Sequence, residues 1–434
     1  MPCERSTKNK NQMTHEIYRT LPGLLINEIS IVESRGLSKC EISVPECAHA
    51  IVTSAISRSS GKSPLVVVAA TNSEAEKLFT DLKSYLGSEK VEFFPSWETL
   101  PFERVSPGVE TMGKRLRVIH RLMSSEANLE VVVTSVRALV QKLFIQEQTF
   151  PIRLKAGDLI DHGELTKKLI LFGYKREYQV EHRGELAIRG SIIDLWPSTS
   201  AFPIRIDFWG DEIERLCEFG VADQRSKQPV DEVEAFPCRE LILDPEMLKK
   251  ASFMADQNNW GTEEWKKLAE GELFDGMESF LPWLLNDSVS LGDIIPEEGM
   301  LLLLDRKRLR SRVADLLEKE NRLAESLSKT WSFEGSELPE LHSSFETSLE
   351  SCKASIWSIN SIPTDLSTKK IKATTFESVK GERLTKNSTH KSFERLRELL
   401  DKNFHLVVAA DGEGSAKRLF EVFEKEGLPV AIEN

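Results

Sequence analysis

The tripeptide Gly-Lys-Ser at 61–63 has the residue types that end a phosphate-binding loop, and an apolar run follows it. Such a loop needs an earlier glycine, a preceding strand and a following helix, because backbone N–H groups at a helix N-terminus wrap the phosphates. Here Ile56 occupies the position of the first glycine. The order is also reversed, since 47–63 is typical of a helix ending in a polar loop and 64–70 of a buried strand. We therefore interpret 61–63 as a solvated loop.

Other residues of catalytic type lack the spacing of a reaction centre. The stretch DGEGSAK at 411–417 lacks the third glycine of a dinucleotide-binding loop, which favours a turn entering a helix. Glu98 and Glu103 lie in a proline-rich loop where no paired acid and base can be argued. Four histidines have neither metal-ligand spacing nor a nucleophile motif beside them, and they are His49, His120, His162 and His182. We expect no catalytic residue, no metal site and no cofactor in this chain.

A binding face is better supported by the residues near 204–209, which alternate between apolar and polar. In a strand this alternation places one set of side chains in the core and the other set outside. The inner set is Ile204, Ile206 and Phe208, and the outer set is Arg205, Asp207 and Trp209. Arginine and tryptophan are enriched at binding hot spots, and arginine pairs with carboxylates. Arg189 in AIRG could lie on a neighbouring strand, so the pattern predicts a protein-binding face.

Composition limits the function further. The chain has 434 residues, 40% of them hydrophobic, and a net charge of −12, which argues against a general nucleic-acid coat. The six cysteines form no CxxC pair, as in a reduced protein. The polar N-terminus has no signal-peptide core, and no apolar run is long enough to cross a bilayer. We expect a cytoplasmic protein that does not contact a membrane.

The order of elements predicts an α/β fold. Strands and helices alternate from 64 to 144, which indicates a parallel sheet with right-handed crossovers. A β-rich segment over 181–219 follows, with a hairpin turn at WGDE. The run MLLLLD at 300–305 is a further strand before a charged helix. Residues 406–432 echo the first strand and helix, so we expect a parallel-sheet, Rossmann-like domain with a degenerate phosphate loop, an inserted small α+β domain and a second, incomplete α/β domain.

Two long blocks resemble one protein family. FFPSWETLPFERVSPGVETMGKRLRVIHRL resembles a loop and helix of the transcription-repair coupling factor family (Mfd). QVEHRGELAIRGSIIDLWP, followed by PIRIDFWGDEIERLCEF, resembles the segment that this family shares with the excision-repair protein UvrB. The resemblance runs from about residue 40 to the end and is dense at 92–144 and 178–224.

The resemblance implies specific site residues. Two family arginines and an aromatic residue that bind UvrA match Arg189, Arg205 and Trp209, although the family often has phenylalanine at the last position. The UvrB phosphate loop matches a segment without glycine or lysine, represented by Ser43, Val44, Pro45, Glu46 and Cys47. Such a loop can neither cradle nor neutralise a phosphate, which resembles the degenerate N-terminal module of the family.

The resemblance also implies how the chain is divided. We expect a lead-in over 1–40, a UvrB-like α/β domain 1a over 41–148, an α+β UvrA-binding domain 2 over 149–240 and a domain 1b over 241–345. A linker of weak structure over 346–390 and the start of a truncated α/β domain 3 over 391–434 would follow. Serine, threonine and charged residues are frequent over 323–390, which favours a connecting region there.

An adaptor function follows from the family. The full family protein recognises RNA polymerase stalled at DNA damage, displaces it by ATP-driven translocation and recruits UvrA for nucleotide excision repair. ATP, magnesium, polymerase and damaged DNA belong to segments C-terminal to this sequence, so this chain is expected to bind UvrA without being an enzyme. The alternative is an ATP-dependent DNA helicase or a UvrB-like excision-nuclease subunit, which needs a phosphate loop. A direct DNA-binding module is a third reading, and its binding should weaken steeply with salt.

Overall fold

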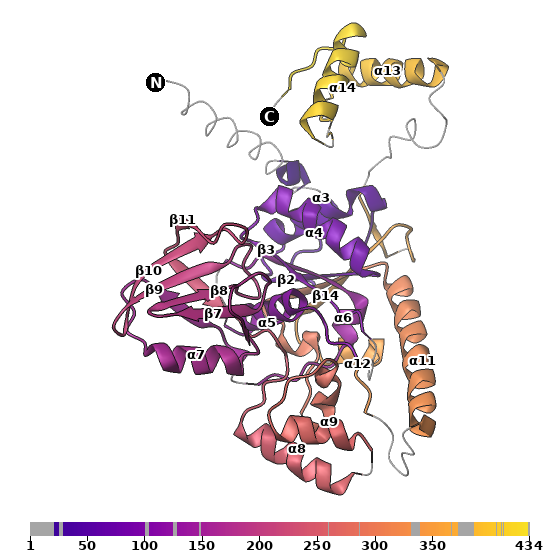
Figure 1. The fold of residues 1–434 in the computed structure, drawn as a ribbon. Coiled ribbons are helices and arrows are strands. Elements are labelled where there is room, and N and C mark those ends of the chain that lie inside the picture. The colour runs from indigo at the N-terminus through magenta and orange to yellow at the C-terminus, as the bar shows by residue number, and fades with distance from the viewer. Residues whose placement is uncertain are drawn as a thin grey trace, which may run out of the picture.

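The computed structural model describes residues 21–432 apart from 26–28, 100–103, 125–127, 147–148, 331–338, 372–385 and the single positions 259, 286, 366, 405, 409 and 411. Its centre is a seven-stranded sheet in the order β15-β1-β14-β13-β2-β4-β3, in which all neighbours are parallel (Figure 1). The strands are β1 (Lys39–Ser43), β2 (Leu65–Ala69), β3 (Val91–Phe94), β4 (Val131–Ser135), β13 (Met300–Leu304), β14 (Ser355–Asn360) and β15 (Lys369–Lys370). The predicted fold class is confirmed.

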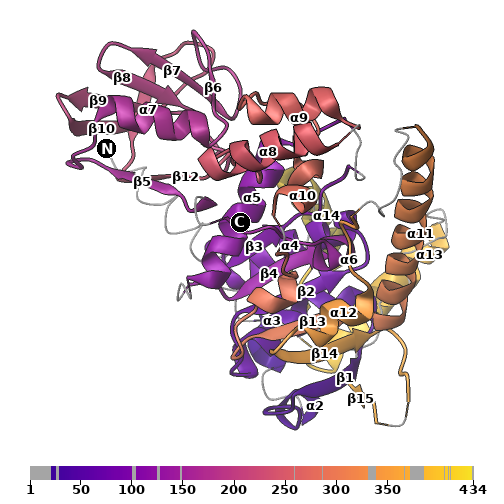
Figure 2. The same ribbon diagram turned by 90° about the horizontal axis from the view of Figure 1, so that it is seen from below.

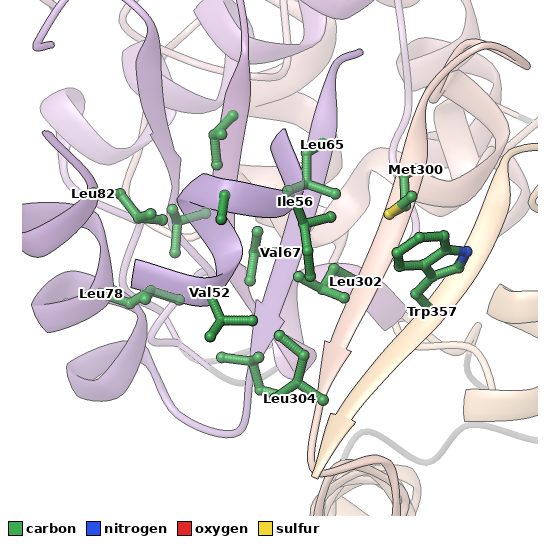
Figure 3. Packing of buried hydrophobic residues seen from close by; sticks show 14 of the residues in the cluster. Val52, Ile56, Leu65, Val67, Leu78, Leu82, Met300, Leu302, Leu304 and Trp357 are labelled. Carbon is green, nitrogen blue, oxygen red and sulfur yellow. The ribbon is translucent and has the colours of Figure 1, made fainter. Parts of the chain in front are cut away.

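Helices cover both faces of this sheet, because its strands are apolar on both sides. On one face lie α3 (His49–Ser59) and α4 (Asn72–Leu86), whose apolar side chains pack on β2 and β13 (Figure 3). Thr71 caps α4 by accepting a hydrogen bond from the Glu74 N–H, and Gly87 follows its last residue. On the other face lie α5 (Val109–Met123), α6 (Val136–Val140), α11 (Arg306–Thr330) and α12 (Phe345–Glu350).

Strand β14 corrects the expectation of a weakly structured linker over 346–390. Residues 345–350 form α12, and Ser355–Asn360 enter the middle of the sheet between β1 and β13. Trp357 is buried and donates its indole N–H to the Leu37 carbonyl at 3.0 Å. The serines and the asparagine of this strand masked its burial in the sequence. The remainder of the expected linker at 372–385 lies outside the described residues.

The β-rich segment forms a separate six-stranded sheet in the order β11-β10-β9-β8-β7-β6 (Figure 1). Its strands are β6 (Lys175–Arg176), β7 (Glu185–Arg189), β8 (Ile192–Leu195), β9 (Ile204–Trp209), β10 (Glu212–Phe219) and β11 (Ser226–Pro229). Neighbours are antiparallel except β6 and β7, so the predicted meander and its hairpin at WGDE are confirmed. Helix α7 (His162–Leu171) covers one face, and β5 (Ile152–Lys155) pairs with β12 (Glu232–Ala235) beside it.

A third core is helical and rich in aromatic residues. It is built by α8 (Pro245–Gln257), α9 (Thr262–Ala269), the 3-10 turn η4 (Met277–Phe280) and α10 (Leu281–Leu284). The rings of Trp260, Trp265, Phe280 and Trp283 contact one another there. Figure 2 shows α8 and α9 beside the six-stranded sheet, and helix α11 runs along the other side of the molecule. The remaining short turns are η1 (Leu21–Leu25), α2 (Ile29–Val32), η2 (Glu46–Ala48) and η5 (Leu291–Ile294).

The C-terminal part differs from its expected strand-helix-strand order. Helices α13 (Lys386–Asp401) and α14 (Glu413–Lys425) form, and the Phe393 and Phe423 rings pack at 5.9 Å. No strand is found at 406–408 or 429–432, where strands had been expected. A strand is stabilised by a hydrogen-bonded neighbour, and the part of the chain that the structure describes supplies none beside these segments. No helix among the described residues is long and apolar enough to cross a membrane.

Candidate partner-binding face

The six-stranded sheet has one face in the core and one face that no helix of the described residues covers. On the core side of β9, Ile204, Ile206 and Phe208 are buried in the cluster that includes Leu165 and Leu169 of α7. On the other side Arg205 and Asp207 are half-buried, whereas Trp209 is 78% exposed. The alternation predicted from the sequence is therefore confirmed, and we call this outer side the arginine face.

The centre of the arginine face is the carboxylate of Asp194, which is fully buried. Strand pairing places Asp194 directly opposite Arg205. Arg205 donates from Nε to Oδ1 at 2.7 Å and from a terminal nitrogen to Oδ2 at 2.9 Å, and Arg189 also donates to Oδ2. Two of the predicted site residues thus meet on one acid. Sequence reasoning missed Asp194, although IIDLW does place an acid inside an apolar strand.

Gln224 holds both arginines from the loop after β10. Its carbonyl accepts a hydrogen bond from Arg205 at 3.1 Å, and its side-chain oxygen accepts one from Arg189 at 3.4 Å. Its amide nitrogen donates to the carbonyls of Val180 and Val221 at 3.2 and 2.8 Å. The backbone of Gln224 is left-handed, with φ 56°. A side chain rarely adopts this conformation without support, so these bonds fix the loop against the sheet.

The two arginines differ in what they offer to a partner. The Arg205 side chain is 15% exposed, and its guanidinium lies 5.0 Å from the centre of the Phe219 ring. Hydrogen bonding to Asp194 raises the pKa of Arg205, because the carboxylate favours the charged guanidinium. The Arg189 side chain is 43% exposed. Arg205 therefore acts mainly within the face, and Arg189 is more accessible.

A third arginine extends the face. Cross-strand pairing joins Arg189 to Ile192, Ile192 to Asp207 and Asp207 to Arg215, so these four residues form one row across the sheet. Arg215 donates from Nε and a terminal nitrogen to Asp207 at 3.0 and 2.6 Å, and its side chain is 60% exposed. Trp209 lies two residues beyond Asp207, at the turn through Gly210. Sequence reasoning missed Arg215, which the register brings onto the face.

Buried ion pairs attach the six-stranded sheet to the parallel-sheet domain. Arg115 of α5 is fully buried and donates to Glu240 at 2.6 Å, and the Trp97 indole N–H donates to the same oxygen at 2.8 Å. Arg239 donates to buried Glu278 at 2.8 Å. Burial of charge is costly unless it is paired, so these bonds define one arrangement of the segment that carries the arginine face.

The other predicted positions do not gather into a reaction centre. The loop of Ser43 to Cys47 joins β1 to η2 and α3, as a phosphate loop would, but it contains neither glycine nor lysine. Burial lowers the pKa of His49, the first residue of α3. The Gly-Lys-Ser loop connects α3 to β2, as predicted. The backbone carbonyl of Glu98 accepts a hydrogen bond from the Arg137 side chain. Glu103 and Asp411 lie outside the described residues.

The other predicted histidines are also scattered. His120 lies on α5, His162 begins α7 and contacts the Phe208 ring, and His182 lies 3.3 Å from Glu185. In the part of the chain that the structure describes, no cluster of three or more histidine, cysteine, aspartate and glutamate side chains could hold a metal ion.

Comparison with known proteins identifies the segment that carries the arginine face. Residues 152–241 match the family described as the UvrB interaction domain. The chain is 38% identical over 305 residues to the transcription-repair-coupling factor of Mycobacterium bovis, covering 66% of this chain and 24% of that protein. The factor of Myxococcus xanthus is 31% identical over 280 residues, covering 60% and 23%, and that of Bacillus subtilis is 26% identical over 292 residues, covering 63% and 25%.

These matches cover only part of the relatives' length. The chain spans about a quarter of the length of the relatives that it matches. The segment 152–241 that the family model matches contains Asp194, Arg189, Arg205, Trp209 and Arg215. The chain is therefore similar, over part of its length, to the transcription-repair-coupling factors, and its residues 152–241 match the UvrB interaction domain.

Proposed function

We propose that this chain is the N-terminal adaptor part of a transcription-repair coupling factor and that it binds UvrA through the arginine face. The observation that carries the proposal is the pair of arginines held on one buried carboxylate inside the UvrB interaction domain. In the complete protein this contact would recruit nucleotide excision repair to RNA polymerase stalled at damaged DNA. Recruitment, polymerase binding and DNA translocation are proposed from the relatives' names and the family resemblance.

The geometry suggests a division of roles within the face. Arg205 donates hydrogen bonds to Asp194 and Gln224, so its main role is to fix the position of its neighbours. Arg189 and Arg215 are the accessible cations, and they suit acidic side chains of the partner. Trp209 supplies a flat apolar anchor whose burial on binding removes water from a large area. Because the face is preformed, little conformational entropy is lost on binding.

We propose a binding function without enzymatic activity for this chain. The loop at Ser43 to Cys47 stands where a phosphate loop would stand, yet Val44, Pro45 and Glu46 cannot supply its glycine N–H groups or its lysine. The proposal that this chain binds no cofactor also depends on the residues of this loop. We propose the bacterial cytoplasm as the site of action, because the proposed contact with UvrA would be made there.

The decisive experiment is a titration of UvrA from the same organism against the chain, followed by calorimetry or fluorescence anisotropy. Arg189→Ala and Trp209→Ala should each weaken binding about thirtyfold, which corresponds to roughly 2 kcal/mol at an interface hot spot. Arg153→Ala is the matched control, because Arg153 is a half-exposed arginine of the neighbouring β5–β12 sheet. Unchanged binding by both variants, or an equal loss in the control, would contradict this interface.

The alternative function is an ATP-dependent helicase or excision-nuclease subunit. It requires nucleotide to bind the parallel-sheet domain, and the residues of the degenerate loop speak against that. Titration of the chain with magnesium-ATP tests it directly. Micromolar affinity that is lost on substitution within 43–49 would favour this alternative over the adaptor.

A further inference from the structure

A cleft of about 460 Å³ lies at the edge of the seven-stranded sheet, far in the chain from the arginine face. It opens at the carboxyl ends of β2, β3 and β4 and is bounded on one side by α11. Figure 2 shows α6 and α11 on the same side of the sheet. Its polar lining includes Thr71, Asn72, Ser135, Arg137, Arg312 and Lys319. None of these residues has a role in the proposed binding of UvrA.

The cleft lies where the connections of the sheet change sides. Strands β2 and β4 are neighbours, but α4 after β2 packs on one face and α6 after β4 packs on the other. The loops that leave the two strands therefore diverge and leave a crevice between them. In open parallel sheets, ligands bind in the crevice outside the carboxyl ends of the strands at such a point.

The start of α4 supplies backbone donors to this crevice. The N–H groups of Glu74 and Ala75 donate to Thr71, so those of Asn72 and Ser73 are the first-turn groups that remain for a ligand. Asn72 is positioned because its side-chain oxygen accepts a bond from the Ser96 hydroxyl at 3.2 Å. The positive end of the 15-residue helix adds to the attraction of an anion.

A buried hydroxyl gives an independent indication of a ligand. Ser135, at the end of β4, lines the cleft and is 1% exposed. Its hydroxyl oxygen has no hydrogen-bond partner among the described residues. A buried polar atom without a partner is rare in a folded protein, because desolvation is then not compensated. An oxyanion in the cleft would offer the missing acceptor after a small rotation of the hydroxyl.

Three cations converge on the cleft from two helices. Arg137 of α6 is held by hydrogen bonds to the carbonyls of Glu98 and Thr99, at 3.2 and 2.7 Å. Arg312 and Lys319 are seven residues apart on α11, about two turns, so they lie on one side of that helix. The lining also contains Glu98 and Asp315, which leaves a net positive charge in a chain of net charge −12.

We propose that this cleft binds the oxyanion of a phosphate ester. Backbone N–H groups, a hydroxyl and guanidinium and ammonium groups surround it from three elements, which suits the several oxygens of a phosphate better than a planar carboxylate. The phosphate can belong to a small molecule or to the backbone of a nucleic acid, and the lining recognises the group that both share. The inference goes beyond the proposed UvrA adaptor role, which needs neither ligand.

The test uses the whole chain and two probes, inorganic phosphate and a short single-stranded oligodeoxythymidylate. Arg312→Ala/Lys319→Ala removes two cleft cations, and Lys307→Ala/Arg322→Ala removes two cations of the same helix outside the lining. Binding of a probe should fall at least tenfold in the first variant and less than twofold in the second. Loss of two phosphate contacts should also reduce the slope of log affinity against log salt by about 1.4 for the oligonucleotide, since each contact with a single strand contributes about 0.7.

The outcomes separate the sources and can overturn the proposal. Binding of the oligonucleotide alone assigns the cleft to a nucleic-acid backbone, and binding of phosphate as well assigns it to the phosphate group itself. If neither probe binds the folded wild-type chain, or if both double variants lose affinity equally, the cleft is not a phosphate site. Ser135→Ala gives a second measurement: it should weaken binding while the melting temperature, compared with wild type, stays within a few degrees.

Discussion

The carboxylate of Asp194 lies opposite the guanidinium of Arg205 and receives two hydrogen bonds from it, 2.7 and 2.9 Å long. The Asp194 carboxylate is fully buried on the outer side of the six-stranded sheet, and Arg189 donates to it from the next strand. Arg205, which the sequence predicts as a partner-binding residue, therefore also holds the structure of the sheet together. The distinction leads to different outcomes for substitutions on one face.

Replacing Asp194 by asparagine should destabilise the chain. The substitution keeps the side-chain shape but leaves Arg205 without its compensating charge, and loss of one partner of a buried pair costs about 3 kcal/mol. The free energy of unfolding in urea measures it. Asp207→Asn is the control, because its partner Arg215 is exposed and the loss there should be about 1 kcal/mol or less. Equal losses in the two variants would contradict a special role of Asp194.

Arg215 should matter for binding and not for stability. Its side chain is largely exposed and its contact with Asp207 is a surface pair, so Arg215→Ala should change the free energy of unfolding by about 1 kcal/mol or less. Its place in the same row as Arg189 predicts that affinity for UvrA falls about fivefold or more. The two quantities are measured by urea denaturation and by the UvrA titration. Unchanged affinity would restrict the interface to the Arg189 and Trp209 side of the face.

The contact between Arg115 and Glu240 should control the attachment of the UvrB interaction domain. Glu240→Ala leaves the fully buried Arg115 without its carboxylate, and we expect a loss of about 3–5 kcal/mol in the free energy of unfolding. Limited proteolysis should then cut the chain between the two sheets. Glu234→Ala provides the comparison, since Glu234 pairs with Arg153 at 2.9 Å on the surface. A small effect of Glu240→Ala would mean that apolar packing and the Arg239–Glu278 pair hold the junction without this contact.

The cysteines should differ in their reactivity toward alkylating reagents. Burial raises the pKa of the Cys238 thiol to about 12, so this group stays protonated and unreactive at pH 8 while the chain is folded. Cys47 is exposed in the loop before α3. Mass spectrometry after brief iodoacetamide treatment should find Cys47 modified, and Cys238 modified only after denaturant is added. Rapid modification of Cys238 in the native protein would show that its surroundings open readily.

The sequence predicts those features that depend on local pattern. The alternation over 204–209 is sufficient to place Arg205 and Trp209 outside, and the turn at Gly210 is sufficient to define the hairpin. Asp194 and Arg215 could not be assigned in the same way, because their neighbours depend on the register between β8, β9 and β10. Register is a property of two paired strands, so it cannot be predicted from the sequence of either strand alone.

Two further differences have the same physical origin. Strand β14 was missed because its serines look polar, although it pairs with β1 on one edge and β13 on the other and lies between helices on both faces. Strands at 406–410 and 429–432 were expected because valine and alanine favour strands, but no neighbouring strand pairs with the described residues there. The cleft beside α4 could not be foreseen, because Arg312 and Ser135 are brought together only by the sheet.

The position of β14 also sets the order in which the protein can be completed during synthesis. Strand β1 pairs with β14 and β15, and neither exists until the ribosome has passed residue 355. Strand β1 therefore stays unpaired while the six-stranded sheet and the helical aromatic core are synthesised. Strands so distant in sequence also pair slowly. A chain truncated at residue 345 would leave β1 without its partner strands and with an exposed, aggregation-prone edge. A chain truncated after residue 371 would contain both partners, so the sheet could be completed.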